Sequence, residues 1–421
     1  MSTYPLQVQG RLDSSRLAWI ASVALTGSLA GVIIVSYIPG ALGVDSRLAT
    51  VPFRGLMLII LLYTSYRWLD ASQLRIGISV TSLLAVFFWT AYCVKFLVDA
   101  ALLQIPLGRP PWDMTLYLFG MCLPAFIVFY LIKDVSLYRK ALIWTMLGLG
   151  ACCLVSMFRT QTAQDVAIHG GGYDANEVLS HISYGHMGVT SAILGLFVLL
   201  RIDRIRRPWY LRLLGAGAAC AGGFTILASA SRGALVAGIL LIPVVVYMGL
   251  RRGSKFLSIA MLVVFSGVLS VTATYLDQNG MNLDRQFGYA TAFTITNLSV
   301  YNRDTMYRDA WHEYMDHPWA GDLIVERNSL SYPHNAIIEA FMATGTFGGA
   351  AFALLVLIAI RRAFRLIKRN PAMAWISLCF FQQLIGAMFS GGLYSNAPLW
   401  GMMAIILGVE IPRVRPEGWA R

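Results

Sequence analysis

The sequence predicts an all-α polytopic integral membrane protein with about twelve transmembrane helices. Its 421 residues are 57% hydrophobic and only 13% charged, and the mean hydropathy is +0.64. Soluble domains carry roughly 25% charged residues. Many apolar runs reach the roughly 17–25 residues that a helix needs to cross a bilayer, and they do not alternate as the strands of a membrane barrel do. A bundle of membrane-spanning helices is therefore expected.

Twelve segments are predicted to span the membrane, and the second is the least secure because it is short and carries Arg54. The first has the length of a full span and no small-residue cleavage site, so it is expected to be a retained helix and not a signal peptide. The segments are 17–37, 51–66, 76–98, 115–132, 141–158, 182–200, 213–228, 235–250, 256–275, 337–360, 372–393 and 398–411.

The distribution of Lys and Arg predicts that both termini are cytoplasmic. If alternate loops are assigned to the cytoplasm, starting with the N-terminus, that side holds 23 of the 33 basic residues and only five of the 21 acidic ones. Basic residues favour the cytoplasmic side of a membrane protein. The net charge of +12 then marks topology beside anionic membrane lipids, and no nucleic-acid partner is expected.

Two long segments are predicted on the outer side. They are 159–180 and 276–336, and the second contains a helical pattern over 301–315. The chain 1–421 is expected to form a single transmembrane domain, with 276–336 inserted as a loop between the ninth and tenth spans. All six cysteines lie in apolar runs without metal-ligand spacing, so disulfides and structural zinc are not expected.

The tenth span opens on a titratable side chain and an amide, in the segment 332–335 (sequence YPHN). A helix that begins there would present free backbone N–H groups beside His334, which suits an anion. Histidine is also the side chain most easily used as a proton acceptor near neutral pH. The alternative is that His334 and Asn335 only cap a membrane helix at the water boundary.

Two arginines are predicted on the same outer surface as His334. Arg232 lies in a tight turn between the seventh and eighth spans, and no acidic residue lies within several positions. A phosphate is therefore its expected partner, because the guanidinium fork fits phosphate oxygens, and snorkelling to lipid headgroups is the alternative. Arg303 lies in the long outer loop, where it either joins this site or pairs with Asp304 or Asp309.

Four further residues are weaker candidates. Arg159 ends the fifth span, where it either contacts a phosphate or anchors the helix at the interface. Arg308 is grouped with the phosphate-binding arginines, and its alternative is a structural pair with Asp304 at i, i+4. His181 and His186 are five residues apart, a poor spacing for metal ligands on one helix face, so they are expected, with Asn335, to contact a substrate in the pocket or to be satisfied boundary residues. No metal and no cofactor are expected.

Together these residues resemble the O-antigen ligase and polymerase superfamily. The resemblance extends over about 213–393, whereas the first six spans match only in hydropathy. It rests on an ordered set of motifs in the expected loops: Ser231-Arg232-Gly233, then Arg303 fourteen residues before the segment 317–321 (HPWAG), then His334-Asn335 with Gly345.

The resemblance implies an enzyme of GT-C-like architecture in the bacterial inner membrane, with its active site facing the periplasm. Members of this superfamily use a glycan linked to undecaprenyl diphosphate as donor, without nucleotide or metal. The ligase branch transfers this O-antigen to lipid A–core, and His334 followed directly by Asn335 favours that branch. In the implied single displacement with inversion, His334 is the base that accepts the acceptor's proton, while Arg232 and Arg303 hold the diphosphate.

Several alternatives remain open at this stage. His334 could bind phosphate instead of accepting a proton. The enzyme could be an O-antigen polymerase or a protein O-oligosaccharyltransferase of the same superfamily. A multi-span lipid or glycan transporter is less favoured, because the two halves of the chain are not similar and the candidate charges cluster at one face. A structural scaffold would give no reason for these charges. The sequence does not indicate the oligomeric state.

Overall fold

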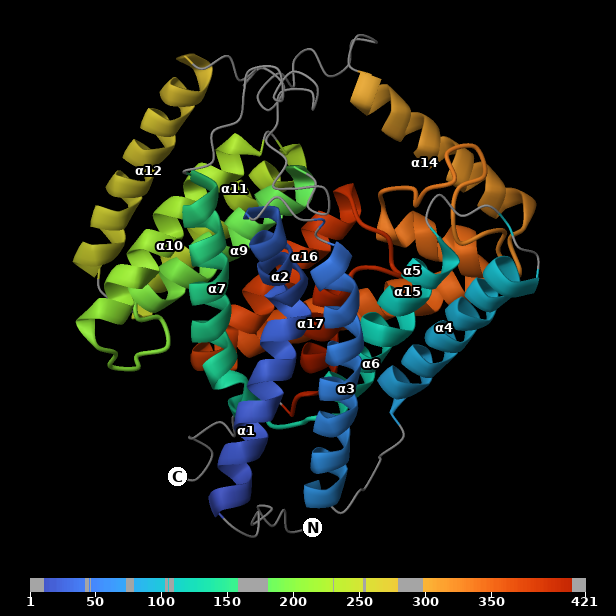
Figure 1. Ribbon diagram of the computed structural model, residues 1–421, viewed down its shortest axis with the longest axis horizontal. Helices are drawn as coiled ribbons and strands as arrows, with labels where there is room; N and C mark the ends of the chain where they lie inside the picture. The colour runs from blue at the N-terminus through green and yellow to red at the C-terminus, as the bar shows by residue number, and fades with distance from the viewer. Residues whose placement is uncertain are drawn as a thin grey trace, which may run out of the picture.

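The computed structural model describes residues 11–41, 45, 47–72, 79–102, 105, 110–157, 181–229, 231–252, 255–278 and 298–410, and these are nearly all helical (Figure 1). Within them, β structure is confined to one bridge between Glu326 and Ser331. Ten helices in this part of the chain are long and apolar enough to cross a membrane. The protein is a polytopic helical membrane protein, as the composition predicts.

Each of the twelve predicted spans coincides with a helix. The elements that contain them are α1 (Arg11–Thr26) continuing through η1 (Gly27–Gly31) into α2 (Val32–Ala41), α3 (Arg47–Ser72), α4 (Val80–Leu97) with η2 (Val98–Leu102), α5 (Pro111–Tyr117) through η3 (Leu118–Cys122) into α6 (Leu123–Leu131), η4 (Val135–Tyr138) with α7 (Arg139–Met157), α9 (His181–Leu199), α10 (Trp209–Ala228), α11 (Arg232–Arg252), α12 (Lys255–Gln278), α15 (Ala336–Arg369), η5 (Pro371–Met373) with α16 (Ala374–Phe389), and α17 (Ala397–Gly408).

Three boundaries differ from the sequence prediction. α3 runs over 26 residues, because Arg54 is accommodated by an ion pair with Asp113 and by the ring of Tyr117, 3.6 Å from its guanidinium carbon. α16 ends at Phe389 and not near 393, because the backbone turns extended and then left-handed at Gly391. α17 has only 12 residues, a rise of about 18 Å. Twelve complete crossings therefore stay a prediction.

Glycines bring α9 and α10 into close backbone contact. A Cβ at Gly195 would lie 2.4 Å from the carbonyl oxygen of Gly215, and one at Gly222 would lie 2.5 Å from that of Gly188. Small residues of this kind let membrane helices approach where no hydrophobic effect drives them together. The pair forms a wall of the bundle against which α7 and α11 also pack.

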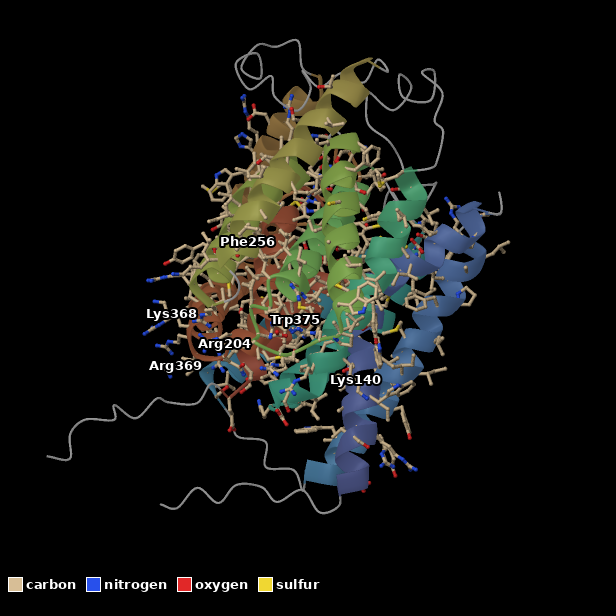
Figure 2. The ribbon with its side chains drawn as sticks, turned by 90° about the vertical axis from the view of Figure 1, so that its left-hand side faces the viewer. Lys140, Arg204, Phe256, Lys368, Arg369 and Trp375 are labelled. Atoms are coloured by element: carbon tan, nitrogen blue, oxygen red, sulfur yellow. The ribbon has the colours of Figure 1, made fainter. Side chains whose placement is uncertain are left out.

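The predicted cytoplasmic loops gather at one end of the bundle. Figure 2 shows Lys140, Arg204, Lys368 and Arg369 toward the same lower end. At this end Arg362 donates to the carbonyl oxygens of Ile406 and Val409. Burial lowers the pKa of Lys133 in the loop before η4. The grouping agrees with the charge asymmetry of the sequence, whereas the assignment of this end to the cytoplasm stays a prediction.

The second outer segment forms a folded unit at the opposite end. Residues 279–297 of the predicted loop lie outside the described residues, and helix α14 (Leu298–Asp316) matches the predicted helix over 301–315. Asp99 pairs with Lys95 at 3.1 Å and accepts the backbone N–H of Ile324 at 2.9 Å, which fixes this unit to the end of α4. Figure 1 shows α14 slanting down toward α4 and α15.

The segment 317–321 joins this outer unit to a kink in α15. Gly345 has φ +66° and ψ −169°, a conformation that essentially only glycine adopts, and a Cβ there would lie 2.4 Å from the carbonyl oxygen of Trp319. Thr346 donates its backbone N–H to Pro318 at 2.7 Å. Gly321 is also left-handed, with φ +75°. The segment 317–321 and the kink at Gly345, which are separate motifs in the sequence, thus pack directly against each other. We call this contact the joint.

Candidate functional site

The start of α15 differs from the sequence expectation in its hydrogen bonding. Asn335 is the N-cap, and its side-chain oxygen accepts the N–H groups of Ile337 at 3.0 Å and Ile338 at 3.2 Å. The expected free N–H groups beside His334 are therefore occupied at these two positions, because a cap residue satisfies them first. The capping alternative holds for Asn335, and any contact of this residue with an acceptor stays a proposal.

His334 itself is held in an unusual backbone conformation. Its φ is +55°, in the left-handed region that residues other than glycine seldom occupy. The imidazole packs edge-on against Tyr332, with ring centroids 4.7 Å apart, and the Tyr307 hydroxyl donates to the His334 carbonyl oxygen at 3.4 Å. The side chain is half-buried. A strained residue fixed from two sides is typical of functional sites.

Arg232 is the first residue of α11. Ser231 precedes it and caps the start of α11. Its hydroxyl accepts the Ala234 N–H at 3.4 Å and its carbonyl oxygen accepts the Leu235 N–H, so the helix begins there. A cation at a helix N-terminus is opposed by the helix dipole. The half-buried guanidinium and the dipole therefore both favour an anion at this position.

The turn between α16 and α17 connects the Arg232 end of α11 to His334. Gly233 packs against Phe389, since a Cβ on it would lie 3.1 Å from the Phe389 Cβ. A Cβ on Gly392 would lie 3.2 Å from the ring of Tyr332, which in turn contacts His334. Two segments a hundred residues apart thus border one short turn.

His186 lies beside this turn on α9. Its Nδ1 is 3.0 Å from the side-chain nitrogen of Gln382, and its ring faces Gly233 and Gly386. Gln382 also accepts a hydrogen bond from Thr190 at 3.0 Å. The predicted candidate is therefore a neighbour of Arg232, set in a polar cluster between α9, α11 and α16.

The position of Arg303 lies on α14, one helical turn before Tyr307. Residues four apart share a helix face, so Arg303 is on the side of α14 that meets His334. The side chain of Arg303 lies outside the described residues. Arg308 forms an exposed ion pair with Asp304, as the structural alternative predicts.

One comparison with known proteins finds a related family. A family profile described as O-antigen ligase matches residues 216–321, which include Arg232 and Arg303. The match supports membership of the O-antigen ligase superfamily. No curated protein is significantly similar to it.

The remaining candidate residues from the sequence differ in how far the match and the structure cover them. His334 and Asn335 lie beyond the matched segment but adjoin α14, which ends inside it. Arg159 lies outside the described residues. His181 is the first residue of α9 and is half-buried. The roles assigned to all of these residues stay proposals.

Glu339 is a buried residue of the site region that the sequence did not single out. Its carboxyl is fully buried and accepts the Leu393 N–H at 2.9 and 3.0 Å and the Tyr92 hydroxyl at 3.1 Å. Glu339 thereby fixes the turn that carries Gly392, on which Tyr332 packs. A carboxyl inside a predicted span signals such a role by itself, since it needs a partner there.

A second missed carboxyl lies in the outer unit. Burial raises the pKa of Glu313 to about 7, although the backbone N–H of Arg327 donates to it at 2.8 Å. The neighbouring Asp322, which accepts from the Arg327 side chain at 2.6 Å, adds to the increase in the Glu313 pKa. The same hydrogen bond raises the pKa of Arg327.

Proposed function

We propose that this protein is an O-antigen ligase. In this proposal it transfers an O-antigen glycan from undecaprenyl diphosphate to lipid A–core oligosaccharide at the periplasmic face of the inner membrane. The observation that carries the proposal is the convergence of strained His334 and helix-initial Arg232 on one turn, in a chain whose ligase-like segment contains both arginines.

The reaction is a single displacement with inversion and uses no metal. His334 accepts the proton of an acceptor hydroxyl, whose oxygen then forms a bond to the anomeric carbon while the bond to the diphosphate breaks. Negative charge grows on the diphosphate, and Arg232 and Arg303 stabilise it. This stabilisation increases toward the transition state, because the charge on the diphosphate grows as its bond to the anomeric carbon breaks. The N-terminus of α11 adds to it beside Arg232.

Two further sets of residues complete the proposed site. Arg159 and Arg308 contribute to donor binding from its edge, and His181, His186 and Asn335 border the acceptor. The whole chain 1–421 acts as one transmembrane domain, with 276–336 inserted as a periplasmic loop between the ninth and tenth spans.

The test is glycan transfer by the purified protein from a polyprenyl-diphosphate-linked donor to lipid A–core. His334→Ala is expected to abolish transfer while membrane insertion stays normal, because the base is lost. His312→Ala is the matched control, since His312 is an exposed histidine on α14 and should leave transfer unchanged. Full activity of the His334→Ala variant would remove the base from the mechanism.

Other acceptors distinguish the branches of the superfamily. Elongation of the donor when no lipid A–core is present would identify a polymerase, and transfer to a peptide would identify a protein ligase. Movement of the donor across the bilayer without any transfer would identify a transporter. A pH–rate profile without a titration between about pH 5 and 8 would assign phosphate binding to His334 in place of proton transfer.

A further inference from the structure

Four large apolar side chains form an exposed surface beside the proposed site. They belong to α14, to the segment 317–321 and to α15 just after its kink. We call this the aromatic ledge; its members, with their exposed fractions, are Trp311 (48%), Met315 (57%), Trp319 (71%) and Phe347 (59%). Large apolar side chains exposed on neighbouring elements indicate a partner.

The ledge continues the lipid-facing side of α15. Phe347 begins an exposed stripe on this membrane-spanning helix that goes on through Leu354 and Leu357. The Trp319 ring lies 5.9 Å from the Phe347 ring, between centroids. The surface of the bundle that faces lipid therefore passes without interruption from α15 onto the outer unit.

The depth of the ledge fits the membrane interface. From Phe347 to Arg361, the first basic residue at the other end of α15, the helix rises about 21 Å. The hydrocarbon core is about 30 Å thick, and long basic side chains reach outward from it. Phe347 is then near the far edge of the core and Trp319 lies at the boundary, where tryptophan is enriched.

The exposed side chains of α14 change from charged to apolar toward the membrane-spanning helix α15. Asp304, Arg308, Trp311 and Met315 follow one another at helical spacings on a single stripe. The first two form an exposed ion pair, whereas the last two are apolar and lie at the end of α14 that Figure 1 shows nearest to α15. A stripe that is charged at one end and apolar at the other suits a helix that enters the interface obliquely.

We propose that the aromatic ledge is seated in the bilayer interface of the leaflet on the His334 side, with lipid acyl chains as its partner. A consequence rests on the proposed function. Tyr307 on α14 contacts His334, so a membrane-seated α14 holds the imidazole at the depth of lipid headgroups, which is also where the diphosphate of a lipid-linked donor lies.

The test measures depth and needs no activity. Nitroxides are attached to single cysteines in a cysteine-free background at the ledge positions Met315 and Trp319, and at the control positions Asp304 and Arg308 on the same stripe. In phosphatidylethanolamine–phosphatidylglycerol vesicles, collisions with oxygen should exceed those with a nickel chelate at the ledge, and the reverse should hold at the controls.

Equal accessibility to the nickel chelate at ledge and control positions would overturn the proposal, as would protection of the ledge from both reagents, which indicates a protein cover. Should the cysteine-free background not fold, brominated lipids supply the second measurement. They should quench less of the tryptophan fluorescence in the Trp311→Phe/Trp319→Phe variant than in the natural chain, and an unchanged quenched fraction would contradict the ledge. If the nitroxide depths are as expected but the natural chain transfers no glycan, the proposed function is refuted and the placement of the ledge in the interface stands.

Discussion

Glu339 is predicted to be a main determinant of how firmly the site is held. Its Oε1 accepts from both the Tyr92 hydroxyl and the Leu393 N–H, so removal of the side chain leaves two buried donors without their acceptor. Each such group costs about 1–3 kcal/mol, and the cavity adds on the order of 1 kcal/mol. Glu339→Ala should therefore lower the free energy of unfolding by about 3–7 kcal/mol.

Two milder variants calibrate this value. Tyr92→Phe deletes one of the hydrogen bonds and should cost about 1 kcal/mol. Glu339→Gln keeps Oε1 for both donors, and turns only its amide nitrogen toward the Leu393 N–H, so it should cost much less than Glu339→Ala.

Unfolding by SDS in mixed micelles measures these differences. Trp400 is a suitable reporter, because its indole N–H donates to the Leu393 carbonyl oxygen at 2.7 Å and so senses the turn. If Glu339→Ala unfolds within about 1 kcal/mol of the natural protein, the carboxyl does not fix the turn and the reasoning fails. Glycan transfer should fall in the same order as stability, because Tyr332 and His334 rest on that turn.

Two further predictions concern the outer unit and its joint with α15. Gly345→Ala should lower the free energy of unfolding by about 1–3 kcal/mol or more through backbone strain and a clash with the Trp319 carbonyl; Gly217→Ala, whose Cβ would meet nothing within 4 Å, is the control and should be neutral or stabilising in the same unfolding assay. Because the folded protein keeps the Glu313 proton up to about pH 7 and the unfolded chain releases it near 4.5, stability should decline as pH rises between these values. Glu313→Gln should flatten that decline in melting curves recorded across this range, and an unchanged slope would assign it to another group.

The sequence predicted the helical fold well, because apolar runs of membrane length have one main structural outcome. Lys95 and Asp99 lie four residues apart in one predicted span, where charges need partners, and the structure pairs them. The end of α16 was wrong by about four residues because the apolar run continues past Gly391, where the backbone turns without a change in polarity. The contact between 317–321 and Gly345 could not be predicted, since hydropathy carries no information on contacts between distant segments.

The site was predicted in part. Topology alone assigned Arg232 and His334 to one surface, but it could not indicate that the turn between α16 and α17 connects them. Glu339 lies five residues after His334 in an apolar run, so it needs a buried partner. The sequence does not show that the partners are the Leu393 N–H and the Tyr92 hydroxyl, because both are remote along the chain. Two of the N–H groups expected to be free at the α15 N-terminus, those of Ile337 and Ile338, instead donate to the side-chain oxygen of Asn335.

The left-handed conformation of His334 has a consequence for the order of the two residues at the start of α15. Asparagine tolerates this conformation better than histidine does, and asparagine is also among the best helix caps. Local backbone preference alone would therefore accept Asn at 334 as readily as at 335. The imidazole stands at 334 against that preference, so the chain gives up some local stability to keep it there. Backbone preference therefore does not account for a histidine at this position, which agrees with the role proposed for the imidazole.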